Sequence, residues 1–203
     1  MEWKLFDTPI PYVSTYEFHK DRERAPHLEQ PAHKPRLRRA AVFVKIITQF
    51  ESQPMTVSDL GCGDGGLLSL IQTQTGIADA WGYDFAPANT AGWQERDVKA
   101  ELRDVFGADR DEIKLGEISC VTEVLEHIAN PLGTLRWIGQ TSKYVVASSP
   151  VNETLNYHAS EHAWAWDYSG YALLFNTAHY DVIKHDVVDS FQLILARSDQ
   201  HDT

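Results

Sequence analysis

The stretch VSDLGCGDGG, residues 57–66, decides the fold. It stands between a short β-branched run and the helical pattern GGLLSLIQTQ (65–74). Its glycines free the backbone to turn sharply, and they let a ligand approach the main chain closely. The N–H groups at the start of the next helix point into the same crevice, where open α/β sheets bind their ligands. We therefore expect Asp59, Gly61 and Gly63 to bind a cofactor, with a tight turn that binds nothing as the alternative interpretation.

Strands and helices alternate on both sides of this turn. Before it, RLRRAAVFVKIITQF has apolar residues at helical spacing and predicts a helix to about Phe50. After it, strand patterns alternate with a helix or turn at 87–96 and a helical pattern at 125–140. The seven expected strands lie at 55–60, 79–85, 98–106, 117–124, 143–149, 180–188 and 191–198. We expect an α/β fold: a Rossmann-like, doubly wound, mostly parallel seven-stranded sheet with an antiparallel final strand.

The composition fits one domain with a sizeable core. The chain has 203 residues, of which 43% are hydrophobic. No apolar run is long enough to span a membrane, and the N-terminus lacks the pattern of a signal peptide. The two cysteines, Cys62 and Cys120, offer no disulfide framework. We therefore expect a cytoplasmic protein that does not enter membranes.

The N-terminal part differs from the rest in charge and in proline content. Five of the nine prolines lie in residues 1–35, which we interpret as a proline-rich arm before a domain at 36–198. Such an arm covers an active site, wraps the domain edge or stays a flexible leader. Residues 1–45 carry a net charge of +3, whereas the whole chain carries −11. This balance argues against a broad nucleic-acid surface, and an anionic partner would meet the N-terminal segment.

Two carboxylates sharpen the nature of the cofactor. Asp84 ends the second strand, about 20 residues beyond the glycines, where an acidic side chain accepts hydrogen bonds from ribose hydroxyls. Asp59 precedes the glycines inside the crevice, and a carboxylate there suits an amino-bearing ligand better than a pyrophosphate. These two residues favour S-adenosylmethionine over a dinucleotide.

These motifs resemble those of class I S-adenosylmethionine-dependent methyltransferases over about residues 40–197. SDLGCGDGG is similar to their first motif and GYDF to their second, which implies that Asp84 and Phe85 bind the cofactor. LRDVF is similar to their third motif. This likeness implies that Asp104 meets the adenine amino group and that Val105 meets the ring face.

The stretch TEVLEHIANP, residues 122–131, holds a candidate metal site. It resembles the segment after the fourth strand of the same methyltransferases, which implies a cofactor contact for Glu123. In a helix that begins at Glu123, the side chains of Glu123, Glu126 and His127 would share one face. Two carboxylates and an imidazole suit Mg²⁺ or Mn²⁺, with His162 of SEHAWAWD as a fourth ligand. Alternatively, His127 or His162 acts as a general base without a metal, or the segment is structural.

A second resemblance concerns the acceptor. The Glu-x-x-Glu-His segment, followed by SSPVNETLN and EHAWAW, resembles the pattern of small-RNA 3′-terminal 2′-O-methyltransferases. That likeness implies a metal that holds two ribose hydroxyls and activates the 2′-hydroxyl. Val151 interrupts their Pro-Asn pair, and the acidic charge does not suit RNA. The same Glu-x-x-Glu-His segment also occurs in ubiquinone-pathway O-methyltransferases, which act on catechol-like rings.

The function expected from these patterns is methyl transfer from S-adenosylmethionine to the oxygen of a small hydroxylated acceptor, either assisted by Mg²⁺ or Mn²⁺ or with a histidine as general base. An RNA 3′-terminal 2′-O-methyltransferase is the first alternative, and a non-catalytic cofactor-binding protein is the second. Four aromatic residues, Trp164, Trp166, Tyr168 and Tyr171, either wall the acceptor pocket or belong to the core.

Overall fold

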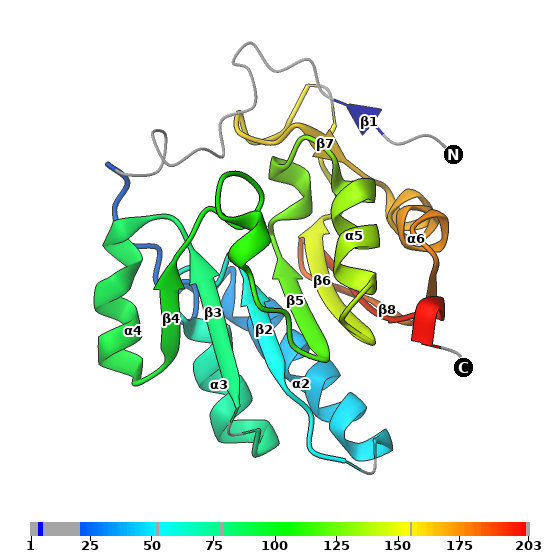
Figure 1. Cartoon of the computed structure of the whole chain (residues 1–203). Coiled ribbons are helices and arrows are strands. Elements are labelled where there is room, and N and C mark those ends of the chain that lie inside the picture. The colour runs from blue at the N-terminus through cyan, green and yellow to red at the C-terminus, as the bar shows by residue number, and fades with distance from the viewer. Residues whose placement is uncertain (1–3, 6–20, 52, 78, 155, 202–203) are drawn as a thin grey trace.

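A single seven-stranded sheet forms the centre of the protein (Figure 1). The computed structural model describes residues 4–5, 21–51, 53–77, 79–154 and 156–201. The sheet consists of β2 (Val57–Leu60), β3 (Ala80–Asp84), β4 (Lys99–Leu102), β5 (Ile118–Thr122), β6 (Tyr144–Pro150), β8 (Tyr180–Val188) and β9 (Phe191–Ser198). Their order across the sheet is β4-β3-β2-β5-β6-β9-β8. The pairs from β4 to β6 are parallel, whereas β9 runs antiparallel to both of its neighbours, so the predicted fold class is confirmed.

Two layers of helices cover the sheet (Figure 1). On one face, α2 (Lys34–Phe50) and α3 (Gly66–Thr75) share an apolar core with β2, β6 and β9, and α4 (Thr90–Arg96) lies beside α3. On the other face, α5 (Pro131–Gly139) and α6 (Tyr168–Thr177) enclose a second core. The helix predicted to end near Phe50 therefore covers one face of the sheet, because its apolar stripe faces the strands.

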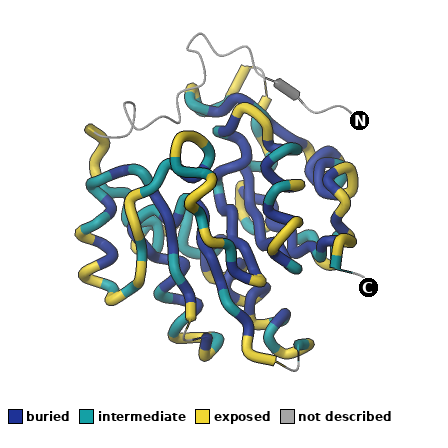
Figure 2. Tube along the Cα trace, viewed as in Figure 1, coloured by how far each residue is buried: buried dark blue, intermediate teal, exposed yellow. Residues whose placement is uncertain are grey.

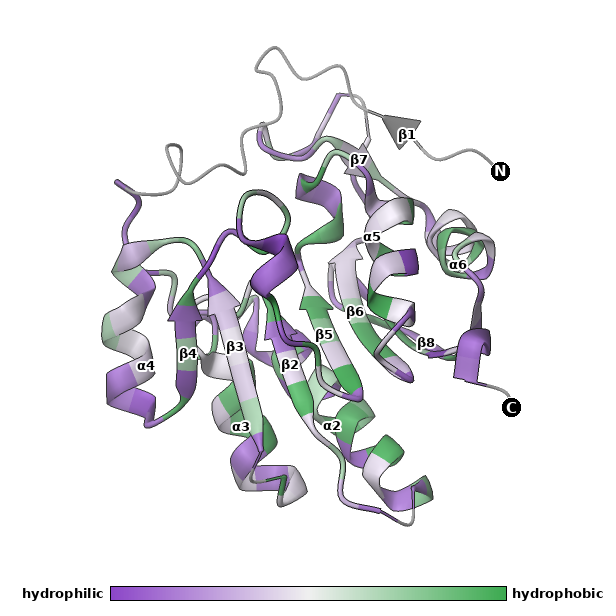
Figure 3. Ribbon diagram, viewed as in Figure 1, coloured by the Kyte–Doolittle hydropathy of each residue, from purple (hydrophilic) through white to green (hydrophobic). Residues whose placement is uncertain are grey.

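The central strands are buried on both faces. Every residue of β2 and β5 is buried, including the polar Ser58, Asp59 and Ser119. Figure 2 shows this burial along the sheet, with the exposed residues on the outer helices and loops. Figure 3 shows hydrophobic residues on β5, β6 and α2 in the same view. Within the described part of the chain, no helix combines the length and the apolar character that a membrane crossing needs.

The segment after β5 differs from the prediction. Leu125–His127 forms a single 3₁₀ turn, and α5 begins only at Pro131. Between β5 and this turn, Glu123 has a φ of +58°, in the left-handed region. The expected helix from Glu123 is therefore wrong, because a left-handed residue does not start a right-handed helix.

The helix α6 and a small two-stranded sheet are absent from the prediction. The side chain of Asp167 caps α6 by accepting a hydrogen bond from the N–H of Gly170 at 2.6 Å. In the small sheet, β1 (Lys4–Leu5) pairs antiparallel with β7 (Trp164–Ala165). The aspartate cap and the apolar spacing that follows it are the sequence signals for α6.

Two of the four aromatic residues singled out near α6, Trp166 and Tyr171, belong to the core. Trp166 and Tyr171 are 2% and 0% exposed, and their ring centroids lie 5.4 Å apart in the second core. Tyr168 is half-exposed and stacks on His185. None of the three lines the cavity described below, so they do not form an acceptor pocket.

The proposed N-terminal arm is only partly described. Residues 21–33 follow an irregular path with turns and lead directly into α2. Most of residues 1–20 lie outside the described part of the chain. The boundary between an arm at 1–35 and a domain at 36–198 remains a prediction.

A closed chain of buried hydroxyl groups joins β2 to β5 at the end of the sheet away from the glycine turn. The N–H of Gly116 donates to Ser58 Oγ at 3.0 Å, and Ser142 Oγ donates to the carbonyl of Gly116 at 2.7 Å. Ser119 Oγ lies 2.8 Å from both serine hydroxyls and completes the ring. A Cβ on Gly116 would lie 2.8 Å from the backbone of β2, so only glycine fits there.

The substitution Ser119→Ala should lower the free energy of unfolding by about 1–3 kcal/mol, because it removes one hydrogen-bond partner from each of two buried hydroxyls, which keep only their bonds to Gly116. Denaturant unfolding measures this change. Ser190→Ala, in the exposed turn between β8 and β9, serves as the control and should change the free energy by less than about 0.5 kcal/mol. Equal effects of the two substitutions would contradict a stabilising role for the hydroxyl chain.

Candidate functional site

A cavity of about 490 Å³ opens at the carboxyl ends of β2, β3 and β5. Asp59, Asp84 and Thr122 line it from the strand ends, and Ala25 and His27 line it from the irregular N-terminal segment. We call this segment, residues 21–33, the strap. The volume is that of a small-molecule site, and the position is where open α/β sheets bind their ligands.

Most of the predicted site residues meet at this cavity. Eight of them line it: Asp59, Gly61, Gly63, Asp84, Phe85, Glu123, His127 and His162. Asp104, Val105 and Glu126 do not belong to the lining. Sequence patterns therefore located the site but not every contact within it.

The glycine turn is fixed to the end of β3. The N–H groups of Gly61 and Cys62 both donate to the carbonyl of Tyr83, at 2.8 and 2.9 Å. Gly61 has a φ of +79°, and an added Cβ would lie 2.7 Å from a methyl group of Val124. Gly63 has a φ of +53°, and its missing Cβ faces open space. The turn thus presents bare backbone to the cavity.

Asp84 holds the same turn through its side chain. Its carboxylate accepts hydrogen bonds from Gly63 N at 2.9 Å, Ala86 N at 2.8 Å and Asn89 Nδ2 at 3.2 Å. Burial raises the pKa of Asp84, and the backbone hydrogen bonds act in the opposite direction. The backbone N–H of Phe85 acts on the same carboxylate. A carboxylate has about four acceptor positions, so a ligand hydroxyl would share an oxygen of Asp84 with these donors.

Asp59 is a buried carboxylate without a hydrogen-bond donor. It is 1% exposed, and neither of its oxygens has a partner among the described residues. Burial is the largest cause that raises its pKa to about 7, followed by the charge of Asp84. Such a group favours a ligand that brings a positively charged donor into the cavity. The amino group of S-adenosylmethionine has this chemistry.

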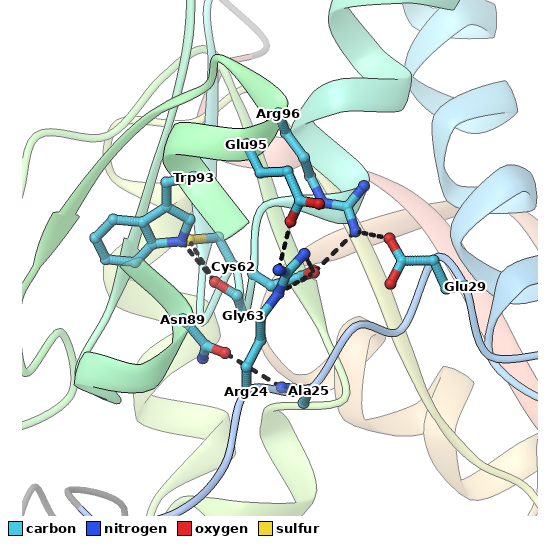
Figure 4. Close-up of polar contacts among 10 residues, drawn as sticks. Arg24, Ala25, Glu29, Cys62, Gly63, Asn89, Trp93, Glu95 and Arg96 are labelled. Carbon is cyan, nitrogen blue, oxygen red and sulfur yellow. Dashed lines mark hydrogen bonds and ion pairs between the residues drawn. The ribbon is translucent and has the colours of Figure 1, made fainter. Parts of the chain in front are cut away.

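The strap is fastened to the glycine turn by a buried carboxylate. Asp64 Oδ2 accepts from Arg24 Nη2 of the strap at 3.0 Å and from Arg96 Nη2 of α4 at 2.9 Å. Arg24 also pairs with Glu95, and Arg96 bonds Glu29 of the strap at 2.5 Å. Figure 4 shows the two arginines converging from the strap and from α4. Spacing rules could not have found this network, because its members are far apart in sequence.

Two further hydrogen bonds close the same region (Figure 4). Asn89 Oδ1 accepts from the N–H of Ala25 at 3.4 Å, which ties the strap to the helical turn after β3. Trp93 Nε1 donates to the carbonyl of Gly63 at 2.7 Å. The strap, the glycine turn and α4 therefore form one connected unit on the side of the cavity next to the glycine turn.

A second group of polar side chains lies at the other half of the cavity. Glu126, His127 and His162 each offer one ligand atom, and these atoms lie within 4.8 Å of one another. The two imidazole rings meet edge to face with centroids 4.5 Å apart. Glu126 is fully buried, and neither carboxylate oxygen has a hydrogen-bond partner in the described part of the chain. Three of the four predicted metal ligands therefore come together.

Each imidazole is oriented by a hydrogen bond at Nδ1. His127 Nδ1 lies 3.1 Å from the carbonyl of Glu161, and His162 Nδ1 lies 2.7 Å from Glu153 Oε2. Because a carbonyl only accepts, the neutral His127 carries its proton on Nδ1 and its lone pair on Nε2. Metal-binding histidines are commonly oriented in this way. Glu153 was missed by the sequence analysis, since no spacing rule links it to His162.

Glu123, the fourth predicted ligand, does not join this group. Its left-handed backbone directs its carboxylate to Ser148 Oγ, which donates to it at 2.8 Å. Glu123 still lines the cavity. Burial raises the pKa of Glu123, and burial followed by the charge of Glu123 raises the pKa of Glu126 well above its ordinary value. Two adjacent buried carboxyls thus avoid ionising together.

The residues predicted to contact adenine lie away from the cavity lining. Asp104 Oδ2 accepts from the N–H of Ala108 at 3.4 Å, within its own turn. Val105 is 1% exposed and packs in the second core. Phe106, the next residue, lines the cavity instead. Its position in the LRDVF motif is the signal that could have identified it.

A mostly parallel open sheet with a glycine turn and a carboxylate at the end of the second strand defines a Rossmann-like domain for a nucleotide cofactor. Within that class, the chain belongs to the methyltransferase domain family, whose model matches residues 32–194. The predicted resemblance to class I S-adenosylmethionine-dependent methyltransferases is therefore confirmed.

Solved structures share this fold at low sequence identity. An O-methyltransferase family protein from Burkholderia thailandensis aligns with 81% of this chain and 55% of its own length, with a TM-score of 0.63 and 12% identity. The methyltransferase domain of bacterial CtHen1-C aligns over 80% of this chain and 98% of its own, with a TM-score of 0.59 and 17% identity. Human N-acetylserotonin methyltransferase in complex with S-adenosylmethionine aligns over 86% and 63%, with a TM-score of 0.59 and 16% identity. A comparison with curated proteins gave no match.

The substitution Asp64→Asn should release the strap, because it removes the charge that both arginines share. We expect the free energy of unfolding to fall by about 1–3 kcal/mol and amide hydrogen exchange in residues 21–33 to accelerate. Asp79→Asn changes an exposed ion pair in the same way and should cost less than about 0.5 kcal/mol. Unchanged exchange in the strap of Asp64→Asn would contradict its fastening by this network.

Proposed function

We propose that this protein transfers the methyl group of S-adenosylmethionine to a hydroxyl oxygen of a small acceptor with neighbouring hydroxyls, assisted by Mg²⁺ or Mn²⁺. The observation that carries this proposal is the convergence of Glu126, His127 and His162 within 4.8 Å at one end of the cavity. The fully buried Glu126 carboxylate without a hydrogen-bond partner among the described residues is the sign that a ligand belongs there.

The cofactor is proposed to bind along the ends of β2 and β3. Asp59 would pair with its amino group, and Asp84 would accept from its ribose hydroxyls. The bare backbone at Gly61 and Gly63 leaves room for close approach. This orientation directs the sulfonium methyl toward the half of the cavity that contains the two histidines. The adenine contacts of Asp104 and Val105 remain predictions, and the cavity lining favours Phe85 and Phe106 beside the adenine.

The donor set fits a divalent cation. A carboxylate and two imidazoles whose Nδ1 atoms are already hydrogen-bonded present three ligand atoms and leave positions for an acceptor. When bound, such a cation acts as a Lewis acid that lowers the proton affinity of an acceptor hydroxyl. Glu123 lines the same end of the cavity and would accept a hydrogen bond from the acceptor.

With the cation bound, the two Nε2 atoms would be its ligands, and the acidified hydroxyl would lose its proton to water. Without the cation, a histidine would act as the proton acceptor. Glu153 orients His162 through a hydrogen bond at Nδ1. The Nε2 atom of His162 would then take the hydroxyl proton while the acceptor oxygen bonds to the methyl carbon and the bond from that carbon to sulfur breaks. His127 would position the same hydroxyl.

An RNA 3′ end is the second candidate acceptor. It is favoured by the segments that contain Glu126, His127 and His162, which resemble those of small-RNA 3′-terminal 2′-O-methyltransferases. The methyltransferase domain of CtHen1-C has a related fold over nearly its full length. The net charge of −11 favours a small acceptor instead, because RNA binding needs clustered basic side chains.

Binding of S-adenosylmethionine should strengthen as the pH rises toward 7. The ammonium group pairs only with ionised Asp59, whose pKa is raised to about 7, so the dissociation constant should fall about tenfold per pH unit from pH 5 and level off near pH 7. Calorimetry in buffers of different ionisation enthalpy should detect release of a proton at pH 6. Asp59→Asn should bind more weakly at pH 7.5, without this pH dependence, whereas Asp79→Asn should behave as wild type. If Asp59→Asn still lost affinity for S-adenosylmethionine as the pH fell, the pairing of Asp59 with the cofactor amino group would be contradicted.

The raised pKa has an opposite effect on the ligand-free fold. Folded Asp59 keeps its proton up to about pH 7, while the unfolded chain loses it above its ordinary value of 3.8. The contribution of Asp59 to the free energy of unfolding should therefore fall as the pH rises between these two values. Comparing the pH dependence of unfolding for wild type and Asp59→Asn measures this contribution.

Titration with Mn²⁺ tests the metal site directly. Wild type should bind one Mn²⁺, and Glu126→Gln should bind it at least about 100-fold more weakly, because a charged ligand is lost. The fold should tolerate this change, because glutamine keeps the size of the side chain and burial, which raises the pKa of Glu126 well above its ordinary value, already disfavours its charged form. Glu112→Gln, at an exposed carboxylate, is the matched control and should bind Mn²⁺ as wild type does.

Activity assays in the same series identify the acceptor. With Mn²⁺, wild type should methylate a catechol, and removal of the metal by chelation should abolish turnover. Faster methylation of a short RNA with a free 3′-terminal diol would favour the second candidate. Cofactor binding without turnover on any hydroxylated acceptor would favour a non-catalytic binding protein. Full catechol methylation by Glu126→Gln would reject the metal-assisted reaction.

A further inference from the structure

Arg36, in the first turn of α2, is a buried cation that lines the cavity. It is 1% exposed, and no carboxylate of the described residues lies within ion-pair distance of it. Its Nη2 atom lies 3.1 Å from His33 Nδ1, and its Cζ atom lies 5.0 Å from the centroid of the Phe191 ring. Its Nε atom has no hydrogen-bond partner among the described residues.

This arrangement is unfavourable unless an anion joins it. A guanidinium group does not lose its proton in a protein, so Arg36 stays charged despite burial. A buried charge without a paired anion is costly, and neutral His33 and Phe191 do not provide that anion. The structure therefore contains a binding position for a negatively charged group of a ligand.

The carboxylates around Arg36 act on it only at longer range. The charge of Arg36 lowers the pKa of Asp59, Glu123 and Glu126, in opposition to the larger effect of burial. These groups thus share one electrostatic environment with Arg36 without contacting it. Asp59 likewise has no partner in the described part of the chain, so the same cavity holds an unpaired cation beside an unpaired carboxyl.

We propose that Arg36 binds the carboxylate of the amino-acid end of S-adenosylmethionine. This inference rests on the proposed pairing of Asp59 with the cofactor amino group. An α-amino acid carries its ammonium and its carboxylate on one carbon, so a site for it needs both a carboxylate and a cation on neighbouring walls. Asp59 and Arg36 supply this pair, and the hydrogen bond to His33 of the strap holds the guanidinium in place. A planar guanidinium also matches a carboxylate with two parallel hydrogen bonds.

The proposal is tested by calorimetry with two ligands that differ only in this carboxylate. The first is S-adenosylhomocysteine, and the second is its decarboxylated analogue with an aminopropyl chain. Wild type should bind the first about 10- to 100-fold more tightly. Arg36→Gln should weaken the binding of S-adenosylhomocysteine by a similar factor. It should change the affinity for the decarboxylated analogue by less than about threefold. Arg38→Gln, an exposed position on the same helix, should leave both affinities unchanged.

Four results would overturn this role of Arg36. Equal weakening of both ligands by Arg36→Gln would mean that the side chain shapes the cavity without contacting the carboxylate. Unchanged binding of S-adenosylhomocysteine to Arg36→Gln would mean that Arg36 does not bind the cofactor carboxylate and would point to a carboxylate of the acceptor as its ligand. If wild type bound both ligands equally, recognition of the carboxylate would be rejected while the cofactor assignment would stand. If wild type bound neither ligand, the cofactor assignment would be rejected as well.

A stability measurement separates recognition from folding. Arg36→Gln removes a buried charge that lacks a paired anion, so the melting temperature of the ligand-free protein should not fall. The rise in melting temperature caused by S-adenosylhomocysteine should shrink. A lower melting temperature without ligand, combined with an unchanged ligand-induced rise, would indicate a structural role and reject the proposal.

Discussion

The hydrogen bond between Gly63 N and the carboxylate of Asp84 joins the two strand ends on which the site depends. It acts together with the two N–H groups of Gly61 and Cys62, which share the carbonyl of Tyr83. The turn after β2 is thereby held against the end of β3, and the start of α3 follows in a fixed position. Asp64, the next residue of the turn, then receives Arg24 and Arg96 and brings the strap over the cavity. Cofactor cavity, turn and strap are therefore consequences of one local backbone arrangement.

The cavity combines buried carboxyl groups with little compensating charge. Burial is the largest cause that raises the pKa of Asp59, Asp84, Glu123 and Glu126. Arg36 is the only buried lysine or arginine in the described part of the chain. Burial therefore favours the neutral form of these carboxyls in the ligand-free protein, whereas positively charged ligands would favour their ionised form. A sulfonium cofactor with an ammonium group and a divalent cation both suit this environment. Charge balance thus connects the cofactor half and the acceptor half of the site.

The sequence could predict features that depend on local patterns. Strand periodicity and the glycine turn predicted the sheet and the place of the cavity, and together with the family resemblance they predicted eight residues of its lining. It could not predict the geometry of Glu123, because the expected helical spacing fails where a strand ends in a left-handed residue. Nor could it predict that Glu153 orients His162 or that Asp64 receives two arginines, because these contacts depend on how distant segments pack. The helix α6 could have been predicted, because its N-terminal cap, Asp167, is a local sequence signal that was not recognised.

The location of the basic residues decides what the N-terminal charge means. Read from the sequence, the net charge of +3 in residues 1–45 offered a place for an anionic partner. In the structure, Arg22 pairs with Glu161, Arg24 with Asp64, and Arg39 with Asp186. These arginines therefore neutralise acidic groups of their own chain and are not gathered into a surface for phosphates. Arg36 differs from these three, because it lines the cavity and is buried. Much of the positive charge of this segment is thus engaged within the chain, which supports the proposed small acceptor over a long nucleic acid.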